Sequence, residues 1–321
     1  MSHWARYFAF AFIFIFSTSI KAQEYPSRPV TVIIPFSSGS ASDVIARIVL
    51  ERMGTSVGQR FVVDNRPAAG GIVGTLAITK AEPDGYTIVM GGSGPLVINR
   101  ALNPKLGYDP EKDFQPISLY ASLPNVAVAS SKLLIQSLAE LAQYVRENPN
   151  TPYSSVGNGS SQHLAGVFFT QLVGAKMQHV PYRVTSQLQA DLVSGQVPVS
   201  FQLLPNVIGA IKSGQVRALA VASNKRLPAL PNVPTAAEAG VKGYESAAWF
   251  GFLAPRGTPK APVDRLYKEI AAATADPAVR SRFTDFGAEP LASTPEEFGR
   301  YIAAEVVKWR EIITRGGITL E

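Results

Sequence analysis

Residues 30–53 read VTVIIPFSSGSASDVIARIVLERM, and this stretch decides the fold. Residues 30–36 form a short apolar run rich in β-branched side chains, which is typical of a buried strand. Residues 42–53 have the periodicity of a helix with one apolar face. That face is formed by Val44, Ile45, Ile48 and Val49. A buried strand that leads directly into a helix is the unit of parallel sheets, so the stretch predicts an α/β fold.

The same alternation continues along the chain. Further strands are predicted at 61–64, 87–91, 117–121, 125–129, 153–156, 177–182, 197–203, 216–222 and 249–253. Helices are predicted at 72–81, 137–147, 161–173, 185–193, 206–212, 261–275 and 295–314. Strands separated by helices imply parallel sheets that carry helices on both faces. The last helix has a strong start signal, since Thr294 and Glu297 form a capping box around Pro295.

The length of 321 residues is too great for one ordinary domain and suits two lobes. Candidate crossing points between them are 119–124 and 240–248. We therefore expect one lobe from 23–123 together with 245–321, and a second lobe from 124–244. Paired crossings make a hinge, and hinged lobes place a ligand cleft between them.

The first 22 residues predict an export signal. Arg6 is followed by the apolar run YFAFAFIFIF at 7–16 and then by small residues up to Ala22, where cleavage is expected. The alternative is a membrane anchor, but about ten apolar residues are too few, because a bilayer core needs about 20. The chain has no cysteine, so neither a disulfide nor a lipid-modified N-terminus is expected. These features predict a freely soluble periplasmic protein.

The net charge and the motifs limit the classes of ligand and activity that are expected. Removing the signal takes away Arg6 and Lys21, so the formal charge falls from +6 to +4. This modest excess suits small anions, and no basic run points to nucleic acid. The stretch GGSGP at 91–95 resembles a hydrolase elbow but ends in Pro95, which would break the helix that an elbow requires. His163 and His179 are the only histidines after the signal and the chain has no cysteine, so we expect no metal. The dinucleotide pattern fails at 157–162 and there is no P-loop, so we expect no cofactor. We expect no catalytic residue, although a triad of distant residues stays open.

Two loops have the composition of an anion site. Residues 35–43 join a buried strand to a helix, and Ser40 with Asp43 has capping-box spacing. The first turn of a helix presents N–H groups without intrahelical acceptors, and its dipole favours negative charge. Residues 157–161 (GNGSS) repeat this chemistry, with His163 close behind. Each loop alone could be an ordinary capped turn, but together they could clamp a molecule that carries an acid group.

Four further residues are candidates for the same cleft. Phe36 could contact a carbon skeleton or belong to the core, and Ser93 follows a strand end between glycines. Tyr182 follows another strand, and Arg183 could bind a carboxylate in bidentate fashion or form a surface ion pair.

The segments that carry these candidates resemble a known family. The matching segments are PFSSGSASD at 35–43, VDNRPAAGG at 63–71, PDGYT at 83–87, YDP at 108–110, GNGSSQHLAG at 157–166, VPYR at 180–183, RALAV at 217–221 and VPTAAEAG at 233–240. In this order they are similar to the tripartite tricarboxylate transporter substrate-binding receptors, the Bug family. The resemblance covers nearly the whole chain after the signal.

The resemblance implies a type II periplasmic-binding-protein fold, α/β, with parallel-rich sheets in two hinged lobes. It implies that 38–43, 159–163 and 182–183 grip a small carboxylate, either a di- or tricarboxylate or an aromatic acid. It also implies a partner, a membrane permease of one large and one small subunit, and we expect a monomer. An orphan receptor for a signalling partner and, less favoured, a periplasmic hydrolase remain alternatives.

Three departures from the family pattern concern the ligand. Ser40 stands where a second glycine is usual, and Pro198 and Gln202 stand where acids are common. We expect the loss of the acid at position 202 to disfavour ligands with an ammonium group. The residues expected to contact the ligand are Phe36, Ser38, Gly39, Ser40, Ala41, Ser42, Asp43, Ser93, Gly159, Ser160, Ser161, His163, Tyr182, Arg183 and Gln202.

Overall fold

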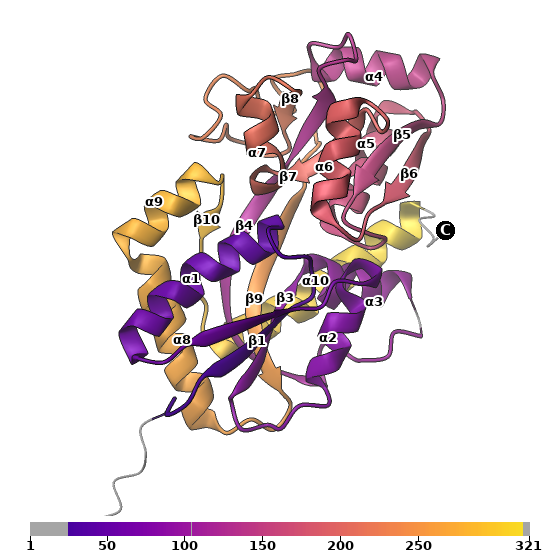
Figure 1. The fold of residues 1–321 in the computed structure, drawn as a ribbon. Coiled ribbons are helices and arrows are strands. Elements are labelled where there is room, and N and C mark those ends of the chain that lie inside the picture. Colours follow the sequence, from indigo (N-terminus) through magenta and orange to yellow (C-terminus); the bar gives the residue numbers. More distant parts are fainter. Residues whose placement is uncertain (1–24, 104, 317–321) are drawn as a thin grey trace, which may run out of the picture.

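The computed structural model describes residues 25–103 and 105–316. The predicted signal peptide, 1–22, lies outside this range. Figure 1 shows two α/β halves, one above the other, joined near the middle by two long strands. Within the described ranges, no helix is both long enough and apolar enough to cross a bilayer.

The first half is built on β1 (Val30–Ile34), which lies between β2 (Phe61–Asn65) and β3 (Thr87–Gly92), all three parallel. The predicted strand–helix unit is confirmed, because β1 leads directly into α1 (Ala41–Val57). The short helices that follow are η1 (Ala69–Gly71), α2 (Ile72–Ile78), η2 (Gly94–Ile98) and α3 (Asn99–Leu102). The prediction for Pro95 was wrong: a π-helical turn starts at Gly94, since proline fits the first turn of a helix, where its missing N–H is not needed.

The second half is built on β5 (Thr151–Ser155), which lies parallel to and between β6 (Met177–Pro181) and β7 (Val199–Leu203). Its remaining elements are α4 (Leu138–Glu147), α5 (Ser161–Val173), α6 (Thr185–Ser194), α7 (Leu204–Lys212) and β8 (Val216–Val221). Helix α5 connects β5 to β6, and α6 connects β6 to β7, as parallel strands require.

The strands β4 (Phe114–Ser130) and β9 (Ala247–Pro255) connect the halves. The prediction of two separate strands at 117–121 and 125–129 was wrong, because β4 is one strand of 17 residues. It pairs with β9 up to Pro124 and with β7 and β8 beyond it. Proline is tolerated at Pro124 because the strand changes its pairing partners there. Both strands pair antiparallel to their neighbours, so the sheets are mixed and not wholly parallel. The lobe boundaries at 123/124 and 244/245 stay a prediction.

The chain ends with helices that return to the first half. These elements are α8 (Lys260–Ala275), α9 (Pro277–Asp285), β10 (Glu289–Pro290) and α10 (Pro295–Gly316). The capping box of α10 is confirmed: Glu297 N–H donates to Thr294 Oγ1 at 3.2 Å, and Glu297 Oε2 accepts from Thr294 N–H at 2.8 Å. Sequence analysis missed α9, a short polar helix that Asp276 caps.

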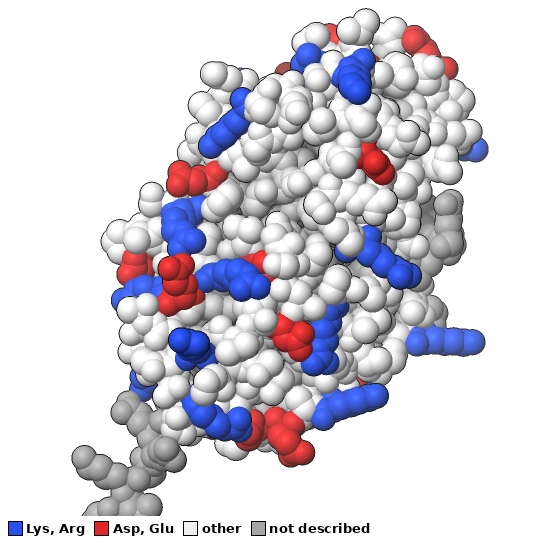
Figure 2. Space-filling model, viewed as in Figure 1, with Lys and Arg blue, Asp and Glu red and all other residues white. Residues whose placement is uncertain are grey.

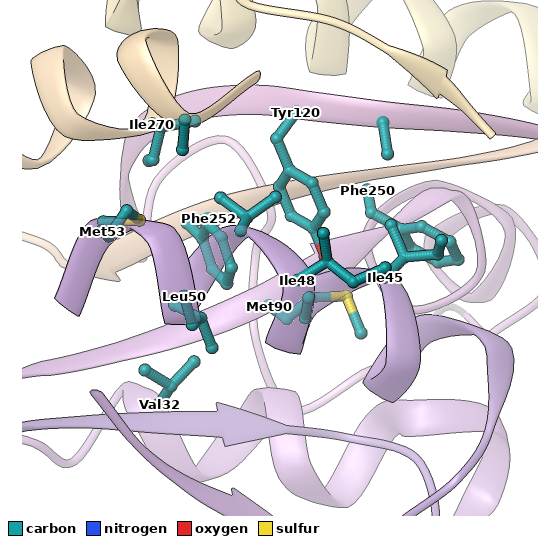
Figure 3. Close-up of a cluster of buried hydrophobic side chains, with 14 of the residues drawn as sticks. Val32, Ile45, Ile48, Leu50, Met53, Met90, Tyr120, Phe250, Phe252 and Ile270 are labelled. Atoms are coloured by element: carbon teal, nitrogen blue, oxygen red, sulfur yellow. The ribbon is translucent and has the colours of Figure 1, made fainter. Parts of the chain in front are cut away.

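The first core lies between α1, α8 and the sheet (Figure 3). Ile45, Ile48 and Met53 project from α1 onto this core, which confirms the predicted apolar face. Tyr120 of β4 and Phe252 of β9 stack there with ring centroids 4.5 Å apart. A separate cluster around Phe169 and Phe201 fills the second half. Each half therefore has its own core, and the connecting strands tie the two together.

Candidate functional site

The loop before α1 is folded around a buried carboxylate. Ser40 caps the helix, with its Oγ accepting from Asp43 N–H at 3.5 Å, and Asp43 Oδ2 accepts from Gly39 N–H at 2.9 Å. Asn65 Nδ2 donates to Asp43 Oδ1 at 2.9 Å and to the Phe36 carbonyl at 3.0 Å. Ser40 is therefore the N-cap, as predicted, but the reciprocal half of a capping box is absent: the Asp43 carboxylate accepts from Gly39 N–H, and the Ser40 N–H donates to the Ser37 carbonyl at 3.1 Å. These bonds fix the course of the loop. They leave the Ser42 N–H without an intrahelical acceptor, because it lies in the first turn.

The loop before α5 has the same design, with Ser160 in the place of Ser40 and His163 in the place of Asp43. Ser160 Oγ accepts from His163 N–H at 3.2 Å, and His163 Nδ1 accepts from Gly159 N–H at 3.1 Å. The His163 ring stacks on His179 with centroids 4.0 Å apart, and His179 Nε2 lies 2.6 Å from Ser155 Oγ. Because Nδ1 of His163 accepts, its other nitrogen carries the proton in the neutral ring.

The two helix N-termini meet at one small cavity between the halves. Its volume is about 20 Å³, enough for about one water. It is lined by Phe36, Ser40, Ala41, Ser42, Gly92, Ser93, Gly94, Pro95, Val156, Ser161, Gln162, Leu203, Asn206 and Phe250. None of these lining side chains is charged, so the polar groups on offer are hydroxyls, amides and helix N–H groups. Such a wall suits a buried carboxylate that is bound by neutral donors.

A wider pocket of about 590 Å³ shares Phe36, Ser40 and Val156 with the cavity. Tyr182 and the exposed Arg183 line it, and among the described residues of this lining Arg183 is the one cation. The Ser37 and Thr185 hydroxyls lie 2.9 Å apart across it, which joins the two halves. The face in Figure 2 carries Lys and Arg interspersed with Asp and Glu. This face therefore carries no broad field of one sign.

Asn206 is a lining residue that sequence analysis missed. It lies in the first turn of α7, and its Oδ1 accepts from Ala41 N–H at 2.6 Å across the two halves. Its Nδ2 donates to Gln202 Oε1 at 2.7 Å. A polar residue three positions after the end of strand β7 was the available signal, but its partner depends on how the halves are placed.

The predicted site residues fall into two groups. Those that line one or both cavities are Phe36, Ser40, Ala41, Ser42, Ser93, Ser161, Tyr182 and Arg183. Those outside both linings are Ser38, Gly39, Asp43, Gly159, Ser160, His163 and Gln202. Asp43, His163 and Gln202 hold the lining loops through hydrogen bonds. Asn99, also missed, lines the wider pocket, and its buried Oδ1 has no hydrogen-bond partner among the described residues.

The stacked histidines make stability depend on pH. Burial lowers the pKa of His163 to about 4, and burial together with the charge of His163 lowers the pKa of His179 to about 3. Both folded values lie below the unfolded value of about 6.5, so the stabilisation is complete above that pH. It is lost as pH falls from about 6.5 through 4 and 3, by at most roughly 3 kcal/mol for His163 and roughly 5 kcal/mol for His179.

We expect His163→Asn to flatten this dependence, since its side-chain oxygen can still accept from Gly159 N–H but does not titrate. Urea unfolding of both proteins between pH 7 and pH 4 measures the effect. Equal losses of unfolding free energy in both would contradict it.

Comparison with known proteins gives consistent matches. Residues 45–318 match the family model described as "Tripartite tricarboxylate transporter family receptor". The periplasmic binding protein BugD is 35% identical, with a TM-score of 0.88, covering 92% of this chain and 100% of that one. R. palustris Rpa4515, solved with adipate, is 35% identical with a TM-score of 0.89, covering 92% and 99%. Rhodopseudomonas palustris MatC, solved with malate, is 33% identical with a TM-score of 0.84, covering 90% and 100%. These matches confirm the predicted periplasmic-binding-protein fold.

Proposed function

The chain belongs to the tripartite tricarboxylate transporter family of receptors, and from this premise we propose that it captures a small carboxylate between its lobes. We propose further that it hands this ligand to a membrane permease of one large and one small subunit. The chain is exported through a cleaved signal at 1–22 and meets its ligand in the periplasm. The receptor acts there as a monomer. The family is one of solute-binding receptors, and capture needs no chemical step.

One observation carries the proposal: two helix N-termini from different halves face one cavity without charged lining residues. A carboxylate placed there accepts from first-turn N–H groups of α1 and α5, including those of Ser42, Ser161 and Gln162. Helix dipoles favour its charge, and no salt bridge is needed. Hydroxyls of Ser93 and Ser42 can supply further donors from the first half.

A second acid group fits the wider pocket. Arg183 stands exposed at this pocket, where its guanidinium can meet a carboxylate that extends from the inner cavity. Two similar structures hold adipate and malate, both of which carry two carboxylates. We therefore favour a dicarboxylate, with its first acid at the helix N-termini and its second towards Arg183.

The inner cavity must widen to admit such a molecule. A volume of about 20 Å³ accommodates a water but not a carboxylate with its carbon skeleton. We propose that the halves open about β4 and β9, the strands that connect them, to admit the ligand, and that they then close on it with Gly70 and Asn158 again in contact.

A thermal-shift screen of protein purified from the periplasm tests the proposal. The panel holds malate, adipate, citrate, phenylacetate, benzoate, amino acids and uncharged sugars. A true ligand at about 100 times its Kd should stabilise the protein by roughly 2.7 kcal/mol, so one carboxylate class should raise Tm selectively. The screen is repeated after unfolding and refolding, which removes any molecule carried from the host. Failure of every acid in both screens would refute the proposal.

A further inference from the structure

We propose that Asn206 is a specificity-determining residue that keeps the cleft free of negative charge and thereby selects acids without an ammonium group. This inference rests on the proposed function and names the ligand class of the same site. It transfers to Asn206 the effect that sequence analysis assigned to Gln202, which is fully buried and outside the cavity lining.

The orientation of the Asn206 amide follows from a chain of buried hydrogen bonds. Ser200 Oγ donates to the Ser154 carbonyl at 2.8 Å, and Gln202 Nε2 donates to Ser200 Oγ at 2.9 Å. Gln202 Oε1 therefore faces Asn206 and accepts from its Nδ2. The remaining atom, Asn206 Oδ1, faces the first turn of α1 and accepts from Ala41 N–H. Gln189 Nε2 also donates to the Asn206 carbonyl, which holds the backbone of this turn.

This arrangement places a neutral acceptor where a charged one would also fit. An aspartate at 206 has the same shape, and its carboxylate would accept from Ala41 N–H at the positive end of α1. Gln202 could turn its amide so that Nε2 donates to that aspartate and Oε1 accepts from Ser200. The polar chain thus allows either residue, and the choice of asparagine sets the charge of the cavity wall.

A charge at position 206 would matter because none of the described residues that line the cavity is charged. A carboxylate at 206 would repel a ligand carboxylate that shares its cavity, through an interior of low dielectric. The same carboxylate would attract an ammonium group on the ligand. With asparagine, an ammonium group finds no partner of opposite charge in this wall, and its burial is costly.

The test compares ligand pairs that differ only by an amino group. The pairs are succinate with aspartate, adipate with 2-aminoadipate, and phenylacetate with phenylglycine. Calorimetry measures Kd for both members of the pair whose acid binds best to the wild type. We expect wild type to prefer the acid without the amino group, and Asn206→Asp to weaken that acid at least about tenfold. The Kd of the amino-bearing member, divided by the Kd of the acid without the amino group, should fall by a similar factor in this variant.

Two further variants complete the test. Asn150→Asp is the matched control: Asn150 is exposed with φ 68°, a conformation that aspartate also tolerates, and the substitution adds the same charge outside the lining of either pocket. Its Kd ratio should equal that of the wild type. Gln202→Glu still accepts from Asn206 Nδ2 and adds the charge one residue behind the wall, so it should shift the ratio in the same direction by less. If Asn206→Asp does not fold, the Kd ratio of Gln202→Glu is compared with that of the wild type instead.

The outcomes separate the two proposals. If the wild type binds no acid, the proposed function fails, and this inference fails with it. If the wild type binds an acid but Asn206→Asp, or Gln202→Glu in its place, leaves the Kd ratio unchanged, only the role of Asn206 is overturned. A ratio that shifts equally in Asn150→Asp would overturn it too.

Discussion

Gly70→Ala is expected to weaken ligand binding at least about 100-fold, a loss of roughly 2.8 kcal/mol, by holding the lobes apart. A Cβ at Gly70 would lie 1.9 Å from the carbonyl oxygen of Asn158, which belongs to the loop before α5 in the other half. The obstacle is backbone on both sides, so no side-chain rotation relieves it. The halves must separate by an ångström or more, and the two helix N-termini then cannot share one ligand.

The matched control for this substitution is Gly58→Ala. Gly58 has φ 66° and Gly70 has φ 61°, so alanine meets similar backbone strain at both positions. A Cβ at Gly58 would meet nothing within 4 Å. Both variants should lose about 1–2 kcal/mol of unfolding free energy, while only Gly70→Ala loses affinity in calorimetry. Binding by Gly70→Ala within threefold of the control would show that the closed arrangement is not the binding state.

The local structure of the chain was largely predictable because short-range physics determines it. The apolar run at 30–36 and the amphipathic stretch at 42–53 gave β1 and α1, and capping residues placed the starts of α1, α5 and α10. Errors arose where distant partners decide the outcome. Pro124 lies within a continuous strand because β9, β7 and β8 supply pairing on both sides of it.

The candidate site divides in the same way. The two serine-bearing loops could be found, since small residues before a helix leave N–H groups free for an anion. Asn206 and Gly70 could not be found, because their significance depends on contacts across the cleft with Ala41 and Asn158. No local pattern encodes how two lobes approach. Gln202 illustrates the limit: the residue type was noticed, but its burial behind Asn206 was not predictable.

The second large effect is expected for Asp43→Ala, which should lower the free energy of unfolding by about 3–5 kcal/mol. Asp43 is 2% exposed, and its carboxylate accepts from Gly39 N–H, Asn65 Nδ2 and Arg47 Nε, each at 2.9 Å. Alanine would leave the first two donors, both in part-buried hydrogen bonds, without this acceptor. Since about 1 kcal/mol corresponds to roughly 2–4 °C in a chain of this order, Tm should fall by about 6 °C or more.

Arg47→Ala separates the role of the loop from that of the ion pair. The Arg47 side chain is 47% exposed, so its salt bridge to Asp43 is screened by solvent and should contribute less than about 1 kcal/mol. Gly39 and Asn65 keep their acceptor in this variant, and the loop before α1 stays folded. Urea unfolding should therefore rank wild type and Arg47→Ala close together, with Asp43→Ala far below. If the two variants lose equal free energy of unfolding, the ion pair between Arg47 and Asp43 holds the loop. The hydrogen bonds from Gly39 and Asn65 would then not be what keeps the first turn of α1 open to a ligand.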